Sequence, residues 1–296
     1  MKAGAGDAQL SYDVADLLKL LDLEPLEFNI YRGLNRDIGS GRVFGGQVMA
    51  QALVAAQRTV DERRVAHSVH GYFILPGDLK SPIVYFVDRL RDGKSFATRR
   101  VTAIQHGQTI FTMSASFHRV EEGLEHQSEM PAVPPPEGLP SELDIIRAGA
   151  EQIPESVRPI LTQDRPLDVR PVRSDPFDAT PRDAVRHLWV RAVGSMQGDT
   201  LSHQAVLAYA SDYGLLATAL QPHGVIIRDP QLQAATLDHA IWFHRDFRMD
   251  EWLLYSMDSP AAAGARGFTR GTIFTRDGQL VASVAQEGLL RLRPAR

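Results

Sequence analysis

The sequence predicts an α+β fold made of two tandem copies of one unit. Each copy contains an apolar helix followed by runs typical of strands, first over residues 44–118 and again over 187–293. The hairpin sequence at 107–111 corresponds to the one at 278–282. Each helix is apolar nearly all round and too short to cross a membrane, so it must be covered on most sides. A curved antiparallel sheet wrapped around a central helix meets that requirement. Two such repeats in one chain form a double hotdog.

We divide the chain into an N-terminal hotdog repeat (1–118), a connecting segment (119–185) and a C-terminal hotdog repeat (186–296). A chain of 296 residues suits two domains of ordinary size. The connecting segment holds 11 of the 18 prolines, and proline cannot donate to a sheet ladder. We therefore expect the segment to wrap over the surface, with a short helix near residues 142–150.

In the first repeat, residues 14–23 predict a helix with Asp13 as its cap, leading into a strand. The apolar helix follows at 45–56. Residues 83–87 form a run typical of a buried strand. The Asp-Gly pair at 92–93 favours a tight hairpin, because glycine accepts a positive φ.

The second repeat follows the same order. Residues 202–219 predict one apolar helix, and the runs 252–257, 267–275 and 280–286 predict a meander of antiparallel strands. A second Asp-Gly pair at 277–278 marks the last hairpin.

Composition narrows the function. The chain has no cysteine, which rules out disulfides, thiolate metal sites and a cysteine nucleophile. A net charge of −4 argues against a nucleic-acid partner. No apolar run suits membrane insertion, residues 1–7 lack the features of a signal peptide, and residues 294–296 are not a peroxisomal signal. We therefore expect a cytoplasmic protein. No histidine spacing resembles a metal site, so we predict no metal and no cofactor.

Polar groups suited to catalysis occur only in the second repeat. Asp212 interrupts the apolar helix, where a carboxylate is costly unless it is hydrogen-bonded or faces a cavity. Thr236 is expected to open the next strand, and Gln286 lies near the end of the last strand, where the first repeat has Ala115. A carboxylate can act as general base toward water, and a hydroxyl and an amide can position that water.

Each of these residues also has a structural interpretation. The aspartate could be satisfied by backbone groups or an arginine, the threonine is ordinary in a strand, and the glutamine could simply end an apolar run. His239 lies beside Asp238 and suggests a dyad, but neighbours on a strand point to opposite faces. We interpret His239 as structural.

Several further motifs accompany these residues. They lie at 44–47, 67–73, 76–78, 238–245, 251–255, 265–267 and 286–288. In their order and spacing the chain resembles the bacterial acyl-CoA thioesterase II family, a double-hotdog group related to the peroxisomal acyl-CoA thioesterases. The resemblance covers nearly the whole chain and places the catalytic Asp, Thr and Gln of the family on Asp212, Thr236 and Gln286. It implies that these three activate a water that attacks the thioester carbonyl of a fatty acyl-CoA, releasing fatty acid and coenzyme A.

The rest of the expected site follows from this substrate. Free N–H groups at the start of the first apolar helix suggest Gly46 as an oxyanion donor, although its glycines could instead serve close packing, and amides beside Thr236 or Asp212 are alternatives. Met49, Tyr72 and Trp242 are candidate lining residues of an acyl tunnel. Arginines that the sequence does not single out would meet the phosphates. The resemblance also implies a homodimer or homotetramer.

Two other functions remain open at this stage. One is an enoyl-CoA hydratase on the same double-hotdog fold, which would need an aspartate and a histidine set a few residues apart. The other is a non-catalytic acyl-CoA-binding protein that kept the fold and lost the chemistry. The first would consume an enoyl thioester without releasing thiol, and the second would bind acyl-CoA without any turnover.

Overall fold

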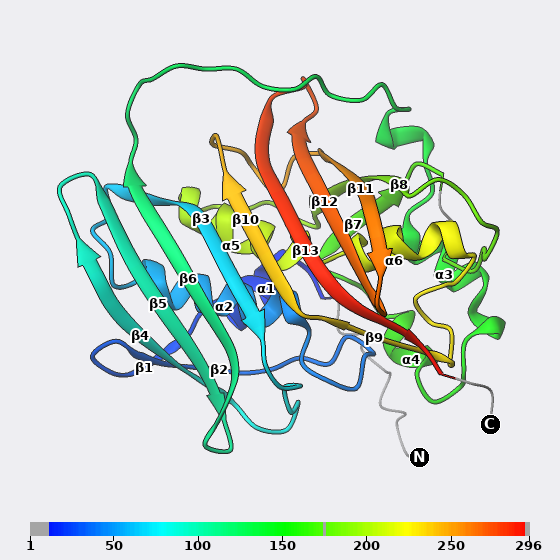
Figure 1. Cartoon of the computed structure of the whole chain (residues 1–296), viewed down its shortest axis with the longest axis horizontal. Helices are drawn as coiled ribbons and strands as arrows, with labels where there is room; N and C mark the ends of the chain where they lie inside the picture. The colour runs from blue at the N-terminus through cyan, green and yellow to red at the C-terminus, as the bar shows by residue number, and fades with distance from the viewer. Residues whose placement is uncertain (1–11, 174–175, 294–296) are drawn as a thin grey trace, which may run out of the picture.

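Two central helices, α2 (Gly45–Gln57) and α5 (Thr200–Ser211), pack against each other on one face of a continuous antiparallel sheet (Figure 1). The computed structural model describes residues 12–173 and 176–293. The segments 1–7 and 294–296, from which we expected no targeting signal, lie outside the described residues. Both central helices are buried along almost their whole length, as their apolar sequences predict.

The sheet order is β1-β2-β4-β5-β6-β3-β10-β13-β12-β11-β8-β7, and β9 pairs with β13. The strands are β1 (Glu24–Glu27), β2 (Ile30–Gly33), β3 (Arg64–Phe73), β4 (Ile83–Asp92), β5 (Phe96–Gln105), β6 (Gln108–Arg119), β7 (Leu167–Pro171), β8 (Val185–Ala192), β9 (Leu232–Thr236), β10 (Asp238–Phe243), β11 (Leu253–Ala263), β12 (Arg266–Thr275) and β13 (Leu280–Leu292). Strands β3 and β10 pair at the centre, with Ala240 opposite His70, and this pairing joins the two repeats. The predicted double hotdog, with a sheet against a central helix in each repeat, is confirmed.

The remaining helices lie outside the central pair. They are α1 (Val14–Leu21), α3 (Glu142–Ala148), α4 (Arg158–Leu161) and α6 (Leu215–Leu220), with short 3-10 turns at Pro136–Gly138, Ala150–Gln152 and Gln221–His223. Asp13 caps α1 as predicted, because its side chain accepts from the N–H groups of Ala15 and Asp16 at 2.9 and 3.2 Å. Within the described residues, no helix has the length and apolar character needed to cross a membrane.

The helix predicted over 202–219 is in fact two helices. α5 ends at Ser211, and α6 begins only at Leu215. Gly214 adopts a left-handed conformation, with φ of 84°, which ends one helix and starts another in a new direction. Asp212 is consequently the C-cap of α5 and does not lie inside a helix, so its carboxylate is free to turn toward α2.

The connecting segment is more structured than its prolines suggest. The short helix expected near 142–150 is present as α3. The segment also contributes β7, which pairs with β8 and forms one edge of the sheet, where the terminal Pro171 is tolerated. Its proline-rich run is tied to the second repeat, because Trp189 Nε1 donates to the Pro134 carbonyl at 2.8 Å.

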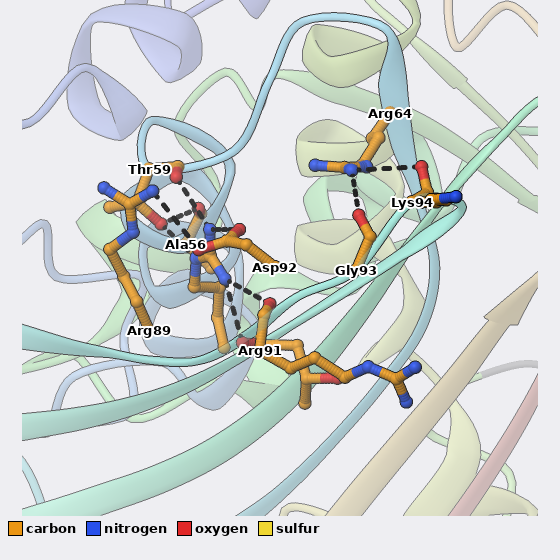
Figure 2. Close-up of polar contacts among 10 residues, drawn as sticks. Ala56, Thr59, Arg64, Arg89, Arg91, Asp92, Gly93 and Lys94 are labelled. Carbon is orange, nitrogen blue, oxygen red and sulfur yellow. Dashed lines mark hydrogen bonds and ion pairs between the residues drawn. The ribbon is translucent and has the colours of Figure 1, made fainter.

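A buried arginine closes the first repeat at the far end of α2. Arg99 on β5 is fully buried, and its guanidinium donates to Thr59 Oγ1 at 2.7 Å, to the Arg91 carbonyl at 2.9 Å and to Asp92 Oδ1 at 2.5 Å. Figure 2 labels the partners Thr59, Arg91 and Asp92 between the end of α2 and the β4–β5 hairpin. Arg99 lies opposite Ala115 in the sheet. The network therefore fills the part of the first repeat that corresponds to the polar site of the second.

Arg99 and its neighbour Arg100 allow a matched test of burial. Arg100 forms an exposed ion pair with Asp88. We expect Arg99→Met to lower the free energy of unfolding by about 2–4 kcal/mol, because it removes the buried donor to Asp92 and to three carbonyls. Arg100→Met should cost less than about 1 kcal/mol. Urea unfolding of both variants measures the difference, and equal losses would contradict the structural role of Arg99.

Candidate active site

The carboxylate of Asp212 lies where the end of α5 meets the start of α2. The Gly46 N–H donates to Asp212 Oδ2 at 3.0 Å. This approach requires the glycine pair, since a Cβ on Gly45 would lie 2.8 Å from Asp212 Oδ2, and one on Gly46 would lie 2.4 Å from the Tyr209 carbonyl oxygen. The two glycines therefore serve close packing and also expose an amide to the carboxylate, as the start of a helix favours.

Thr236 reaches the site through a bulge between β9 and β10. Thr236 lies opposite Gly288 of β13, and Ala240 lies opposite Ala285. The chain advances four positions from Thr236 to Ala240, whereas β13 advances only three from Ala285 to Gly288. The extra residue is Leu237. A bulge breaks the alternation of a strand and re-aims its side chains. Thr236 consequently faces the central helices, and it ends β9, whereas the sequence predicted that it would open the next strand.

Gln286 lies inside β13, six residues before the strand ends, and not near its end as the sequence suggested. Its Nε2 donates to Thr236 Oγ1 at 3.1 Å, and the Thr236 hydroxyl donates to Asp212 Oδ1 at 3.3 Å. The structure thus brings together the three residues that the sequence singled out. They form a chain of hydrogen bonds that ends on the carboxylate.

The surroundings of Asp212 raise its pKa to about 7, from an ordinary value of 3.8. Desolvation is the main cause, because protein atoms surround the carboxyl group even though it reaches a cavity. Hydrogen bonds from Gly46, Thr236 and Gln286 favour the charged form and oppose that rise. A carboxylate with a pKa near neutrality can accept a proton efficiently at physiological pH.

Asp212 and Thr236 open onto a cavity of about 930 Å³. Gln286 lies behind them, with 1% of its surface exposed. One part of the wall is apolar, formed by Val43, Phe44, Val48, Phe73, Ile110 and Phe111. Another part carries six arginines, namely Arg42, Arg165, Arg182, Arg186, Arg228 and Arg293. The cavity therefore has apolar and cationic surface in addition to the Asp212 carboxylate, and Glu142, Asp164 and Asp178 also line it.

The predicted lining residues lie elsewhere. Met49 is buried in the core, Tyr72 is 61% exposed, and Trp242 packs edge-on against His70 with ring centroids 4.8 Å apart. None of the three lines the cavity. Tyr72 and Trp242 belong to β3 and β10, whose side chains alternate between the two faces of the sheet, and composition alone does not say which face is inward.

Three aromatic residues that the sequence analysis did not assign to the site form a wall beside Asp212. The ring of Phe44 meets those of Tyr209 and Tyr213 edge-on, each at 5.1 Å between centroids. All three line the cavity. The sequence could have indicated two of them, because Tyr209 lies three residues before Asp212 and Tyr213 lies one residue after it.

Asp238 and His239 do not contact each other. Asp238 Oδ1 accepts from the backbone N–H of Glu287 at 2.7 Å, whereas His239 points inward with 1% of its surface exposed. Burial lowers the pKa of His239 to about 4, so its ring is neutral. Within residues 12–173 and 176–293, no group of three His, Asp or Glu side chains is arranged to bind a metal ion.

The comparisons with known proteins identify the family of this chain. A sequence profile described as "Acyl-CoA thioesterase" matches residues 157–289, and one described as "Acyl-CoA thioesterase N-terminal domain" matches residues 34–118. The chain is 42% identical to acyl-CoA thioesterase 2 of Haemophilus influenzae, over 93% of this chain and 97% of the relative.

Solved structures are similar over the same extent. An acyl-CoA thioesterase II from Mycobacterium marinum superposes with a TM-score of 0.77 at 45% identity, covering 93% of this chain and 98% of that one. A protein of unknown function with a hot dog fold from Alicyclobacillus acidocaldarius superposes with a TM-score of 0.73 at 20% identity, covering 92% and 96%. The second likeness concerns the fold alone.

The raised pKa of Asp212 predicts a dependence of stability on pH. Between its ordinary pKa of 3.8 and about 7, the folded protein keeps a proton that the unfolded chain has lost. The stability of the wild type should therefore fall as pH rises through this window and level off above it. Asp212→Asn is neutral throughout and lacks this dependence. The melting temperature of wild type minus that of the variant should decrease from pH 5 to pH 8, and a constant difference would contradict the raised pKa.

Proposed function

We propose that this chain, which belongs to the acyl-CoA thioesterase II family, hydrolyses fatty acyl-CoA to free fatty acid and coenzyme A. The observation that carries the proposal is the hydrogen-bonded group Asp212, Thr236 and Gln286, which opens through its carboxylate onto the cavity. We assign to it the activation of a water molecule. No cofactor is needed, because a thioester is already an activated acyl group.

The proposed reaction needs one base and one water. Asp212 takes a proton from a water held beside Thr236, and the water oxygen attacks the thioester carbonyl carbon. The tetrahedral intermediate then collapses, the carbon–sulfur bond breaks, and Asp212 returns its proton to the sulfur of coenzyme A. One O–H bond and one C–S bond are broken, one C–O bond and one S–H bond are formed, and the enzyme ends unchanged.

Gly46 has a second role in this scheme. Its N–H is committed to Asp212 while the carboxylate is charged. Once Asp212 has taken the proton, it becomes a weaker acceptor and its hold on the amide loosens. The amide can then donate to the negative oxygen of the intermediate, so the same N–H steadies the base before attack and the oxyanion after it.

The cavity fits both halves of the substrate. Its apolar wall beside Phe44 and Phe73 suits an acyl chain. Its arginines suit the phosphates of coenzyme A, since guanidinium groups bind phosphate in a bidentate manner.

The two alternative functions have less support. A hydratase would need an aspartate and a histidine acting together, and Asp238 and His239 are held apart by separate partners. A non-catalytic binder would not need a carboxylate whose pKa is raised to about 7 and which three donors hold at the cavity wall.

Thiol release from a panel of acyl-CoAs tests the proposal directly. We expect the wild type to release coenzyme A and Asp212→Asn to lower kcat by roughly 100-fold or more with little change in KM, because the base is lost and the pocket is kept. Asp199→Asn is a matched control, since Asp199 caps the other end of α5 and asparagine caps equally well. Full activity in Asp212→Asn would refute the assignment of the base, and no release by the wild type would favour the binding protein.

The pH dependence of kcat/KM tests the hydrogen bonds to the base. The rate should rise with pH up to about 7, where Asp212 loses its proton, and level off above. Thr236→Val removes a hydrogen bond that lowers the pKa of Asp212, so the rising limb should move to higher pH. Thr218→Val serves as the control, because that buried hydroxyl contacts Gly214 and not Asp212. An unshifted limb in Thr236→Val would contradict the contact.

A further inference from the structure

His239 occupies a place between the strand that carries Gln286 and the helix end that carries Asp212. Its Nδ1 lies 2.5 Å from Gln286 Oε1, and its Nε2 lies 2.8 Å from the hydroxyl of Ser211, the residue before Asp212. The ring is inaccessible to the cavity and to solvent. It therefore cannot touch a substrate, and any effect on the reaction must pass through Gln286 or Ser211.

The hydrogen atoms of the network can be assigned one after another. The Thr236 hydroxyl has a single hydrogen, which is directed to Asp212 Oδ1 at 3.3 Å. Its oxygen must then accept, and the donor is Gln286 Nε2 at 3.1 Å. This orientation of the amide turns Oε1 toward His239. An amide oxygen can only accept, so Nδ1 of His239 must carry a hydrogen.

The other ring nitrogen is assigned by the same reasoning. A neutral imidazole has one N–H, so Nε2 accepts. The Ser211 hydroxyl lies 2.8 Å from Nε2 and 3.0 Å from the Ala208 carbonyl, and in this tautomer it gives its one hydrogen to the closer ring nitrogen. Burial lowers the pKa of His239 to about 4, which keeps the ring neutral at the pH of the reaction. The result is a single direction of donation, from Ser211 through His239, Gln286 and Thr236 to Asp212.

We propose that His239 is a positioning residue, and that its Nδ1–H holds the Gln286 amide with its NH₂ group toward Thr236 and Asp212. This inference rests on the proposed function of the trio. If the hydrogen were on Nε2 instead, the Ser211 hydroxyl would donate to the Ala208 carbonyl, which lies 3.0 Å away. Nδ1 would then be an acceptor and would need a hydrogen-bond donor. The amide would flip, its oxygen would face the carboxylate, and the hydroxyl of Thr236 would be drawn away from the base.

The first repeat supports the pairing of these two residues. Val69 lies opposite Ala115 on strands β3 and β6. In the second repeat Ala240 lies opposite Ala285. One position further along, His239 therefore lies opposite Gln286, as Val69 lies opposite Ala115. The repeat that lacks the glutamine amide therefore also lacks the histidine. Both Val69 and Ala115 are buried, so the difference is not one of exposure.

Two substitutions separate the two ring nitrogens. The amide nitrogen of asparagine can occupy the position of Nδ1, whereas a glutamine amide reaches the position of Nε2. We expect His239→Gln to lower kcat by roughly 10- to 100-fold with KM little changed, because Gln286 loses the donor that orients it. His239→Asn should recover most of that loss. His244→Gln is the control, since His244 contacts Ser283 outside this network.

The outcomes distinguish the inference from the proposed function. A loss of kcat in His239→Gln that His239→Asn recovers supports the positioning role. Equal losses in the two variants, or a change in KM alone, would overturn it and leave His239 as a packing residue. If Asp212→Asn keeps full activity, the proposed function itself fails. If Asp212→Asn is inactive while His239→Gln is unimpaired, only the inference about His239 fails.

Nitrogen-15 NMR of histidine-labelled protein reads the ring directly and does not depend on activity. The protonated and unprotonated nitrogens of a neutral imidazole have separate shifts, and the signals missing from His239→Gln identify the residue. We expect the hydrogen on Nδ1 of His239. A hydrogen on Nε2 would overturn the inference even if the variants behaved as expected.

Discussion

The hydrogen bond from the Gly46 amide to the Asp212 carboxylate joins the start of one central helix to the end of the other. It places a charge where the positive end of the α2 dipole offsets the unfavourable negative end of α5. The two halves come from different repeats, so neither repeat could build the site alone. The β3–β10 pairing fixes the repeats against each other, and the glycine pair lets the helices approach closely enough. The position of the carboxylate at the cavity wall depends on this junction.

Only one of the two equivalent places in the double hotdog carries the trio to which we assign the catalysis. In the second repeat, Gln286 and His239 occupy positions that Ala115 and Val69 occupy in the first. The end of α2 is occupied instead by Arg99, whose donors are all directed to protein oxygens. A buried guanidinium satisfied in this way leaves no free N–H donor for a substrate, and its removal would leave its acceptors unpaired. In the proposed mechanism the first repeat therefore contributes an amide and a scaffold, while the second contributes the reactive groups.

Much of this could be predicted from the sequence. The apolar helices indicated the fold, and a carboxylate among apolar residues marked Asp212. Two local breaks could not be predicted, the left-handed Gly214 that ends α5 and the bulge at Leu237 that turns Thr236 inward. Periodicity assumes regular helices and strands, and both breaks depart from it. The same assumption misplaced Tyr72 and Trp242 relative to the cavity, because the face that a strand buries depends on register and not on its own residues.

The position of His239 shows why the direction of hydrogen bonds matters as much as their number. A buried carboxylate could be stabilised by any donors, but a general base must also lose and regain a proton at neutral pH. Three donors to Asp212 oppose desolvation without cancelling it, which leaves its pKa at about 7. If the Gln286 amide were reversed, one of those donors would become an acceptor facing the carboxylate, and the pKa would rise further. A neutral histidine that cannot reach the substrate can therefore still set the proton affinity of the base.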